Sequence, residues 1–522
     1  MKFLRGDNSG DMKKIYKSSI QRLLFFFLTL AIQIYIIILA ILQFKNYFLY
    51  FYIISLIGGA ILVFYILNGK SNPSYKIAWI VPILLLPIFG GIFYLIYGGN
   101  KLSKREKKKM KNQNIKMKTS LIQDNKVLNR LGEESIYAKN QALYMLNYAN
   151  CPIYENTYNE YLSPGEVKFE KLVEELKKAK HFIFLEYFII EEGIMWNTIL
   201  DILKQKAKEG IDVRVIYDDV GCVMKLPYKY EKQLEKYNIK CRVFNPFVPL
   251  FTNRLNNRDH RKIAIIDGYV GFMGGINLAD EYINAYEKYG HWKDASILIK
   301  GEAVFNLTVM FLSMWDFINN SEDDYLKYKP ENFTSERYLT NGYVQPFDDS
   351  PLVNEPIGET VYLNLINKAK KYIYINTPYL IIDNEMATAL KIAAKSGIDV
   401  RIVTPHIPDK WFVHAVTRSY YHSFIKDNIK IYEYSPGFMH SKTFVVDDEY
   451  AVIGSINLDF RSLYLHFECG AWLYKTDSVL KLKEDFLNTL DLCQQINISD
   501  CENIKWPVKF GRLVLRLFSP LL

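Results

Sequence analysis

The sequence predicts an α/β fold made of two α/β units related by a pseudo-twofold axis and preceded by N-terminal transmembrane helices. Three observations predict this arrangement. The pattern H-x-K-x4-D occurs twice, beginning at His260 and at His440. Strand-like and helical segments alternate in the same order before each copy, which is typical of layered α/β structure. Three apolar stretches open the chain, and each has about the 20 residues that cross a bilayer.

The apolar stretches cover residues 23–43, 47–67 and 77–97. No small-residue cleavage site follows the first, so a membrane anchor is favoured over a removable signal peptide. Buried helices of a soluble protein are the alternative, which three stretches in succession disfavour. The third stretch contains Pro82, Pro87 and a Gly-Gly pair, so it could kink or re-enter the membrane.

The net charge of +9 is unevenly distributed. Residues 1–118 contain 18 Lys and Arg against 3 Asp and Glu, and the rest contains 47 against 53. The acidic remainder argues against nucleic acid as the partner, and the basic excess beside the apolar stretches favours an anionic membrane. With three spans, basic residues divide 10 against 8, which predicts a multi-pass protein of the cell membrane with a cytoplasmic catalytic part. The basic cluster at 101–118 would then face lipid head groups or form a solvated flank.

An internal repeat extends beyond the two motifs. A-K-H-F-I-F-L-E-Y-F at 179 corresponds to A-K-K-Y-I-Y-I-N-T-P-Y at 369, and K-E-G-I-D-V-R-V-I-Y at 208 corresponds to K-S-G-I-D-V-R-I-V at 395. Each unit is predicted to run strand, helix, strand, linker and hairpin, with helices over 195–208 and 385–395. The predicted regions are a membrane region (1–118), a first unit (119–335), a second unit (336–505) and a C-terminal amphipathic segment (506–522).

The chemistry of the repeated motif suits a phosphodiester. His260 and Lys262, two residues apart on a strand, project from one face, and the second copy repeats this with His440 and Lys442. In each half a hairpin leads to a small-residue loop that ends in Asn277 or Asn457. Histidine can attack phosphorus and transfer protons, while Lys and Asn donate to phosphoryl oxygens. Core histidines are the alternative, and the duplication disfavours it.

The sequence implies neither a metal nor another cofactor. Six cysteines show no C-x-x-C pair and no metal-like clustering with histidine, and we interpret them as free thiols. They stand at positions 151, 222, 241, 469, 493 and 501.

The motifs carry a family resemblance. N-R-D-H-R-K-I-A-I-I-D-G-Y-V-G-F-M-G-G-I-N-L-A-D and G-F-M-H-S-K-T-F-V-V-D-D-E-Y-A-V-I-G-S-I-N-L-D-F resemble the two H-K-D motifs of the phospholipase D superfamily, and within it the bacterial cardiolipin synthases. The resemblance implies a phosphatidyl-histidine intermediate. It makes His260 the nucleophile and His440 the acid that protonates the leaving alcohol and then the base that activates the incoming one.

The same resemblance assigns the remaining site residues. Lys262, Lys442, Asn277 and Asn457 resemble a phosphate clamp, and Asp294 and Glu468 stand where carboxylates orient the histidines. Asp294 could equally be a surface strand residue. Asp267 and Asp447 complete the catalytic motifs but look more structural. One departure is His466, which stands where Asn is common.

The implied reaction transfers a phosphatidyl group from one phosphatidylglycerol to another and gives cardiolipin and glycerol. A phospholipase D-type hydrolase, or a phosphatidyltransferase with another alcohol acceptor, is the first alternative. A non-catalytic or nucleic-acid-binding protein of the same fold is the second, which two complete motifs disfavour. Phosphatidylglycerol, cardiolipin and an anionic membrane are therefore the expected partners, without nucleic acid, and the oligomeric state stays open.

Two segments near the motifs have open interpretations. Residues 246–258 lack periodicity and are a candidate loop at the mouth of the site, whose Arg254 and Arg258 would meet lipid phosphates or be solvated. Residues 506–522 form a basic amphipathic pattern with Lys509, Arg512 and Arg516. This segment is expected to lie on the membrane or to pack against the catalytic part.

Overall fold

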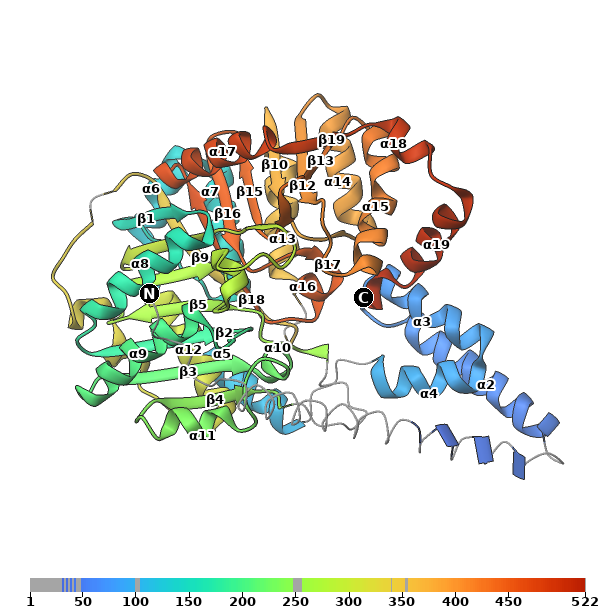
Figure 1. Ribbon diagram of the computed structural model, residues 1–522, viewed down its shortest axis with the longest axis horizontal. Helices are drawn as coiled ribbons and strands as arrows, with labels where there is room; N and C mark the ends of the chain where they lie inside the picture. Colours follow the sequence, from blue (N-terminus) through green and yellow to red (C-terminus); the bar gives the residue numbers. More distant parts are fainter. Residues whose placement is uncertain are drawn as a thin grey trace, which may run out of the picture.

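The computed structural model describes residues 48–98, 104–246, 256–338, 340–352 and 355–521, with isolated helical residues between 31 and 43. The first apolar stretch, apart from those isolated residues, and the loop 247–255 with Arg254 lie outside the described residues. Two β-sheets and the helices that cover them form the body of the protein, and three apolar helices lie to one side of it (Figure 1).

The first sheet has seven strands in the order β1-β8-β6-β5-β2-β3-β4. Strands β2, β3 and β4 are parallel, and the others pair antiparallel. The strands are β1 (Thr157–Leu162), β2 (Phe182–Tyr187), β3 (Asp212–Asp218), β4 (Lys240–Phe244), β5 (Lys262–Ile266), β6 (Val270–Gly274) and β8 (Ser296–Gly301).

The second sheet has eight strands in the order β19-β13-β12-β10-β15-β16-β18-β9. Without β19 this order repeats that of the first sheet, strand for strand, which confirms the two repeated α/β units. The strands are β9 (Tyr343–Asp349), β10 (Tyr372–Asn376), β12 (Asp399–Pro405), β13 (Lys430–Tyr434), β15 (Thr443–Val446), β16 (Tyr450–Gly454), β18 (Glu468–Tyr474) and β19 (Cys493–Ile496).

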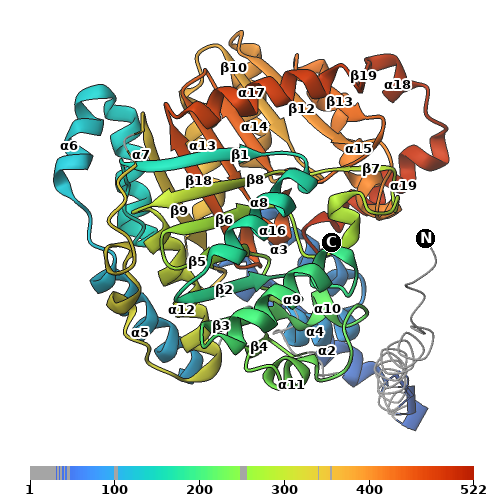
Figure 2. The ribbon, with the colours of Figure 1, turned by 60° about the vertical axis from the view of Figure 1, so that its left-hand side comes forward.

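Helices cover both sheets and join them into one core. Helices α8 (Gly165–Lys178) and α9 (Ile194–Lys208) pack on one face of the first sheet (Figure 2). On the other face lies α12 (Val304–Asn319), 12 of whose 16 residues are buried. Its apolar side chains belong to the same core cluster as those of the second sheet, so the two units share a continuous interior.

The second unit carries a corresponding set of helices. They are α13 (Ile357–Lys368), α14 (Asn384–Lys395), α15 (Trp411–Lys426) and α17 (Asp477–Leu490). Helix α14 matches the predicted helix 385–395, as α9 matches 195–208. Both sequence patterns therefore predicted these helices to within one residue at either end.

Both motif hairpins turn tightly, as expected. Asp267 and Gly268 have φ angles of 51° and 71°, and Asp447 and Asp448 have 56° and 63°. Positive φ at both central residues is typical of the type I′ turn, which matches the twist of the flanking strands. The same turn geometry in both halves gives the two hairpins the same register.

The apolar region contains α2 (Phe48–Leu67), α3 (Pro73–Leu85) and α4 (Pro87–Tyr97). The third predicted stretch, 77–97, is therefore divided at Leu86, whose φ is −135° and ψ is 75°. Pro87 explains the break, because a proline disfavours the helical conformation of the residue before it. In the part of the chain that the structure describes, no helix is both long and apolar enough to cross a membrane.

The basic flank packs against the first unit. Residues 104–120 form α5 (Lys104–Ser120), which lies along α12. Lys116 forms an ion pair of 2.8 Å with Asp316, and Lys109 donates to the carbonyl of Phe317. These two lysines of the 101–118 cluster are thus held by the protein, where a lipid-facing or solvated flank was expected.

Candidate active site

Backbone hydrogen bonds between the two units fix the histidines. The N–H of His260 donates to the carbonyl of Phe467 at 2.9 Å, and the N–H of His440 donates to the carbonyl of Lys293 at 2.8 Å. Beside His440, β7 (His291–Lys293) pairs in parallel with β14 (Gly437–Met439). Each histidine therefore precedes a strand of its own unit while its backbone is bound by the other unit.

Each imidazole also contacts a carboxylate from the other unit. His260 Nδ1 lies 2.9 Å from Glu468 Oε1, and His440 Nδ1 lies 2.6 Å from Asp294 Oδ2. Both carboxylates are fully buried, so the interpretation of Asp294 as a surface residue is wrong. A carboxylate at Nδ1 fixes the tautomer that leaves Nε2 free for chemistry.

The two motif lysines are buried beside the histidines. Lys262 Nζ donates to the carbonyl of His260, and Lys442 Nζ donates to that of His440. Burial lowers the pKa of Lys262 to about 8 and that of Lys442 to about 7, although nearby carboxylates oppose the shift. A bound phosphate would oppose the shift further, because its negative charge favours the ammonium form.

Charged residues of each motif affect the pKa of the histidine in the other motif. Burial, followed by the charges of Lys262, Lys442 and His440, lowers the pKa of His260 well below its usual 6.5. Burial and Lys442 also lower the pKa of His440 to about 4. The cations of both motifs therefore lower the pKa values of the two imidazoles, and an anionic phosphate bound between them would raise these values.

The two loop asparagines differ in their contacts. Asn277 accepts from the N–H of Ile189 at 2.9 Å and donates to the hydroxyl of Tyr282 at 2.7 Å. Asn457 is also buried, but its Oδ1 has no hydrogen-bond partner. The two amides, equivalent in the sequence, are therefore held differently.

The motif aspartates bind backbone at the opposite end of each hairpin. Asp267 accepts from the N–H groups of residues 180–182 at 2.7–2.9 Å, and Asp447 accepts from those of residues 370–372 at 2.6–2.9 Å. Asp267 lies five positions along the chain from Lys262, about 16 Å in an extended strand. We therefore correct their grouping with the catalytic residues, because these carboxylates hold the start of β2 and β10.

A third histidine, which the sequence interpretation set aside, lies beside the first. The ring of His466 is centred 5.6 Å from that of His260, and its Nδ1 lies 3.7 Å from Glu468 Oε1. Both of its ring nitrogens are buried without a hydrogen-bond partner. His260, His466 and Glu468 each place one possible metal-ligand atom within 4.8 Å of those of the other two. The spacing H-x-E at 466–468 was the available signal.

Arg258 does not occupy the position predicted for it. Its side chain is 3% exposed and lies 3.3 Å from Asp218. Arg258 is therefore neither solvated nor at an open mouth of the site, because its guanidinium is used inside the first unit. The neighbouring Arg261 points away from the site, because successive side chains of a strand alternate between its faces, and it pairs with Glu186 and Asp259.

Comparisons with known proteins agree with this geometry. A family profile described as "Cardiolipin synthase, PLD-like domain" matches residues 172–315 and 362–490, and one described as "Phospholipase D-nuclease N-terminal" matches residues 60–99. A cardiolipin synthase of Alkalihalophilus pseudofirmus is 36% identical over 482 residues, 90% of this chain and 92% of its own. An uncharacterised protein of Streptococcus mutans is 44% identical over 465 residues, 88% of this chain and 99% of its own.

The fold also resembles a solved structure. Phosphatidylserine synthase of Haemophilus influenzae Rd KW20 matches with a TM-score of 0.56 and 17% identity, over 73% of this chain and 100% of its own. At this identity the likeness supports the fold alone.

Proposed function

The chain belongs to the bacterial cardiolipin synthases of the phospholipase D superfamily, and from that premise we propose how its two motifs share the reaction. It is a phosphatidyltransferase that moves a phosphatidyl group from one phosphatidylglycerol to a second, with cardiolipin and glycerol as products. One phosphodiester replaces another, so the exchange needs no nucleotide energy source. Each histidine is paired with a carboxylate from the other unit, His260 with Glu468 and His440 with Asp294, and these two crossed pairs are the observation that supports the shared reaction.

In the first step, Nε2 of His260 attacks phosphorus, and the bond from phosphorus to the glycerol oxygen breaks. His440 protonates that oxygen as glycerol leaves. In the second step, the hydroxyl of another phosphatidylglycerol gives its proton to His440 and attacks phosphorus, which releases His260. The shorter carboxylate contact of His440, 2.6 Å against 2.9 Å, favours the imidazolium form that an acid requires.

We propose that Lys262, Lys442, Asn277 and Asn457 hold the phosphoryl oxygens. Burial of both ammonium groups supports this role, because a buried cation gains most from an anionic ligand. Asn457 is the better placed of the two amides, since the amide nitrogen of Asn277 already donates to Tyr282. Lys262 and Lys442 would release their present carbonyl partners when phosphate enters.

We infer that the apolar region attaches the enzyme to a membrane, with several spans and a cytoplasmic catalytic part as the specific arrangement. Large side chains of α2 and α3 support attachment, because Ile54, Phe64 and Leu85 are each more than 65% exposed. Exposed apolar surface of this extent marks contact with lipid or protein. The cluster of nine Lys and Arg at 101–118 supports the orientation, because basic residues next to a span favour the cytoplasmic side.

The decisive experiment uses purified enzyme in detergent with phosphatidylglycerol as the sole lipid. We expect cardiolipin and glycerol in equal amounts. A need for a cytidine-nucleotide-activated lipid would contradict the transfer mechanism. Phosphatidic acid as the main product would instead identify a hydrolase, because water would then be the acceptor.

A chelator should leave this turnover unchanged, since the proposed chemistry uses only protein side chains. The experiment is informative because His260, His466 and Glu468 bring possible metal-ligand atoms within 4.8 Å of one another. If activity disappears with chelator and one divalent metal restores it, these three residues hold a required ion. The variant His466→Asn, with one ligand fewer, would then need more of that metal.

A further inference from the structure

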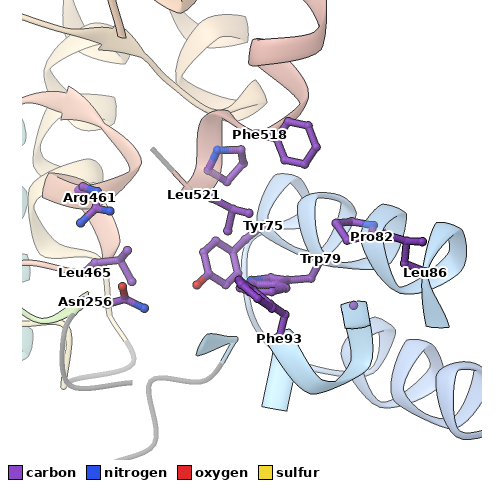
Figure 3. A pocket seen from close by; sticks show the side chains of 12 residues that line it. Tyr75, Trp79, Pro82, Leu86, Phe93, Asn256, Arg461, Leu465, Phe518 and Leu521 are labelled. Carbon is purple, nitrogen blue, oxygen red and sulfur yellow. The ribbon is translucent and has the colours of Figure 1, made fainter. Parts of the chain in front are cut away.

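A cavity of about 500 Å³ lies between the apolar helices and the second unit (Figure 3). Its walls come from α3, α4, α16 (Phe460–Tyr464) and the C-terminal turn η6 (Ser519–Leu521). The lining is mainly apolar, from Trp79, Leu86, Phe93, Leu465, Phe518 and Leu521. Its size falls in the range of pockets that bury small organic ligands.

One end of the cavity is polar. Arg461 of α16 and Asn256 lie there, on the side away from Pro82 and Leu86 (Figure 3). Arg461 is half-buried, and burial lowers the pKa of its guanidinium although Asp459 opposes the shift. An anion at this end would therefore be stabilised electrostatically.

The apolar end continues into surface suited to a bilayer. Leu84, Leu85 and Leu86, where α3 gives way to α4, are each at least 59% exposed. Nearby, α19 (Trp506–Leu517) turns Arg516 inward over the ring of Tyr420 and exposes apolar residues. Those exposed residues are Trp506, Val508, Phe510, Leu513, Val514 and Leu517. The C-terminal segment therefore packs against the catalytic part through Arg516, while its contact with a membrane stays a prediction that the exposed apolar face supports.

The cavity is also joined to the histidine pair. Helix α16 directly links the strand after Asn457 to the segment that carries His466 and Glu468. The N–H of His466 donates to the carbonyl of Arg461 at 2.9 Å. Arg461 in the cavity wall and Glu468, the carboxylate that contacts His260, thus belong to one short stretch of chain.

A polar contact fixes the membrane side of the cavity. Asn72, the N-cap of α3, donates to Asp383 at 2.9 Å and to the hydroxyl of Tyr464 at 3.0 Å. Because Tyr464 ends α16, this contact holds α3 against the helix that carries Arg461.

We propose that the cavity binds an acyl chain of one phospholipid substrate, with the lipid phosphate at Arg461, and so guides that lipid from the bilayer along α16 to the histidines. The inference rests on the proposed function, because it takes the substrate to be an anionic glycerophospholipid. The apolar lining matches the chain, Arg461 matches the phosphate, and the exposed leucines give the open side towards the membrane.

The test compares two tryptophan substitutions in the full chain. Leu86→Trp narrows the cavity, while Leu84→Trp adds the same side chain two residues away, at a position that does not line it. We expect Leu86→Trp to raise KM for dioleoyl-phosphatidylglycerol in mixed micelles about tenfold, and Leu84→Trp to leave it unchanged. With monomeric dihexanoyl-phosphatidylglycerol, whose chains are too short to fill the cavity, both variants should match the wild type.

The charged end is tested with Arg461→Gln and Arg461→Lys. Arg461→Gln should raise KM about tenfold for long and short lipids alike, because both carry the phosphate, and Arg461→Lys should recover part of the loss. Lipid retained by each variant is counted by native mass spectrometry in detergent with dioleoyl-phosphatidylglycerol. Lower retention by Leu86→Trp than by Leu84→Trp is expected.

Equal KM values and equal lipid retention for the two tryptophan variants would overturn the proposal. An equal rise of KM for short and long lipids in Leu86→Trp would also overturn it, since the effect would then not involve the chain. If the wild type retains lipid but makes no cardiolipin from either substrate, the proposed function fails while the binding result still decides the cavity.

Discussion

The two half-sites share a backbone plan but differ in what surrounds each imidazole. Both histidines receive a buried carboxylate from the other unit. Around His260, Glu468 also accepts a hydrogen bond from the hydroxyl of Ser455, and His466 and the single aromatic ring of Phe188 lie close by in the described residues. Around His440, the neighbours are the aromatic rings of Tyr282, Trp292 and Phe438. Duplication thus conserves the pair that orients the imidazole, while the surroundings distinguish a proposed nucleophile from a proposed acid.

Replacing either histidine should have the largest effect. We expect His260→Ala and His440→Ala each to lower kcat by 10⁴-fold or more, roughly the scale of losing a nucleophile or its acid. A lipid with a good leaving group distinguishes the two variants further, because its departure does not need an acid. Only His440→Ala should then accumulate phosphatidyl-enzyme, which intact-mass measurement detects. An adduct on His440 in His260→Ala would reverse the assignment of roles.

Replacing the carboxylates should rank second. Glu468→Gln and Asp294→Asn keep the side-chain shape but remove the charge that fixes each imidazole, so kcat should fall about 10²- to 10⁴-fold. Glu468→Gln should slow adduct formation, and Asp294→Asn should slow loss of the adduct to an acceptor more strongly. Rapid-quench kinetics separates the two steps. Identical effects on both steps in both variants would mean that the half-sites do not divide the work.

The pH dependence should reveal the lysines. Burial lowers the pKa of Lys442 to about 7 and that of Lys262 to about 8. A lysine with a lowered pKa loses its charge as pH rises through that value, so kcat/KM should fall several-fold between about pH 7 and 9. Bound phosphate favours the charged form, so the fall in kcat should occur at higher pH. An alkaline fall in kcat/KM only near the usual lysine pKa would contradict this assignment.

Replacing the motif aspartates should affect turnover least. Asp267→Ala and Asp447→Ala each leave three backbone N–H groups without their acceptor, which should cost about 2–4 kcal/mol of folding stability. Asp267 is 1% exposed and Asp447 is 9% exposed, so the first variant should lose more. Thermal unfolding by circular dichroism checks the order. Turnover per folded molecule should stay within a few-fold of the wild type, and a loss comparable to that of Glu468→Gln would place these residues in the chemistry.

The repeated units were predictable because local pattern determines them. The two motifs, the paired strand segments and the hairpin turn at Asp267 all follow from residue spacing and turn chemistry. The helices over 194–208 and 384–395 follow from apolar periodicity and a glycine beyond their ends. The resemblance suggested Asp294 and Glu468, although spacing alone did not reveal which histidine each would meet.

The rest depends on contacts between segments far apart in the chain. Glu468 meets His260 across 208 residues and Asp294 meets His440 across 146. No local pattern distinguishes the buried Arg258 from a solvated arginine, because its partner Asp218 lies 40 residues earlier, at the end of β3. The same holds for Lys116, which looks like a solvated lysine until α5 packs against Asp316. The break at Leu86 was partly foreseen, since Pro82 and Pro87 indicated a kink.

The crossed pairs also make catalysis a late event in the life of the chain. A ribosome that has produced only the first unit has made His260 without Glu468, and Asp294 without His440. A histidine without its carboxylate lacks the partner that fixes its tautomer, and one motif alone lacks either the proposed nucleophile or the proposed acid. Reactivity towards lipid therefore begins only after the second unit has folded against the first. The phospholipids of the cell are thereby protected from a half-finished phosphatidyltransferase.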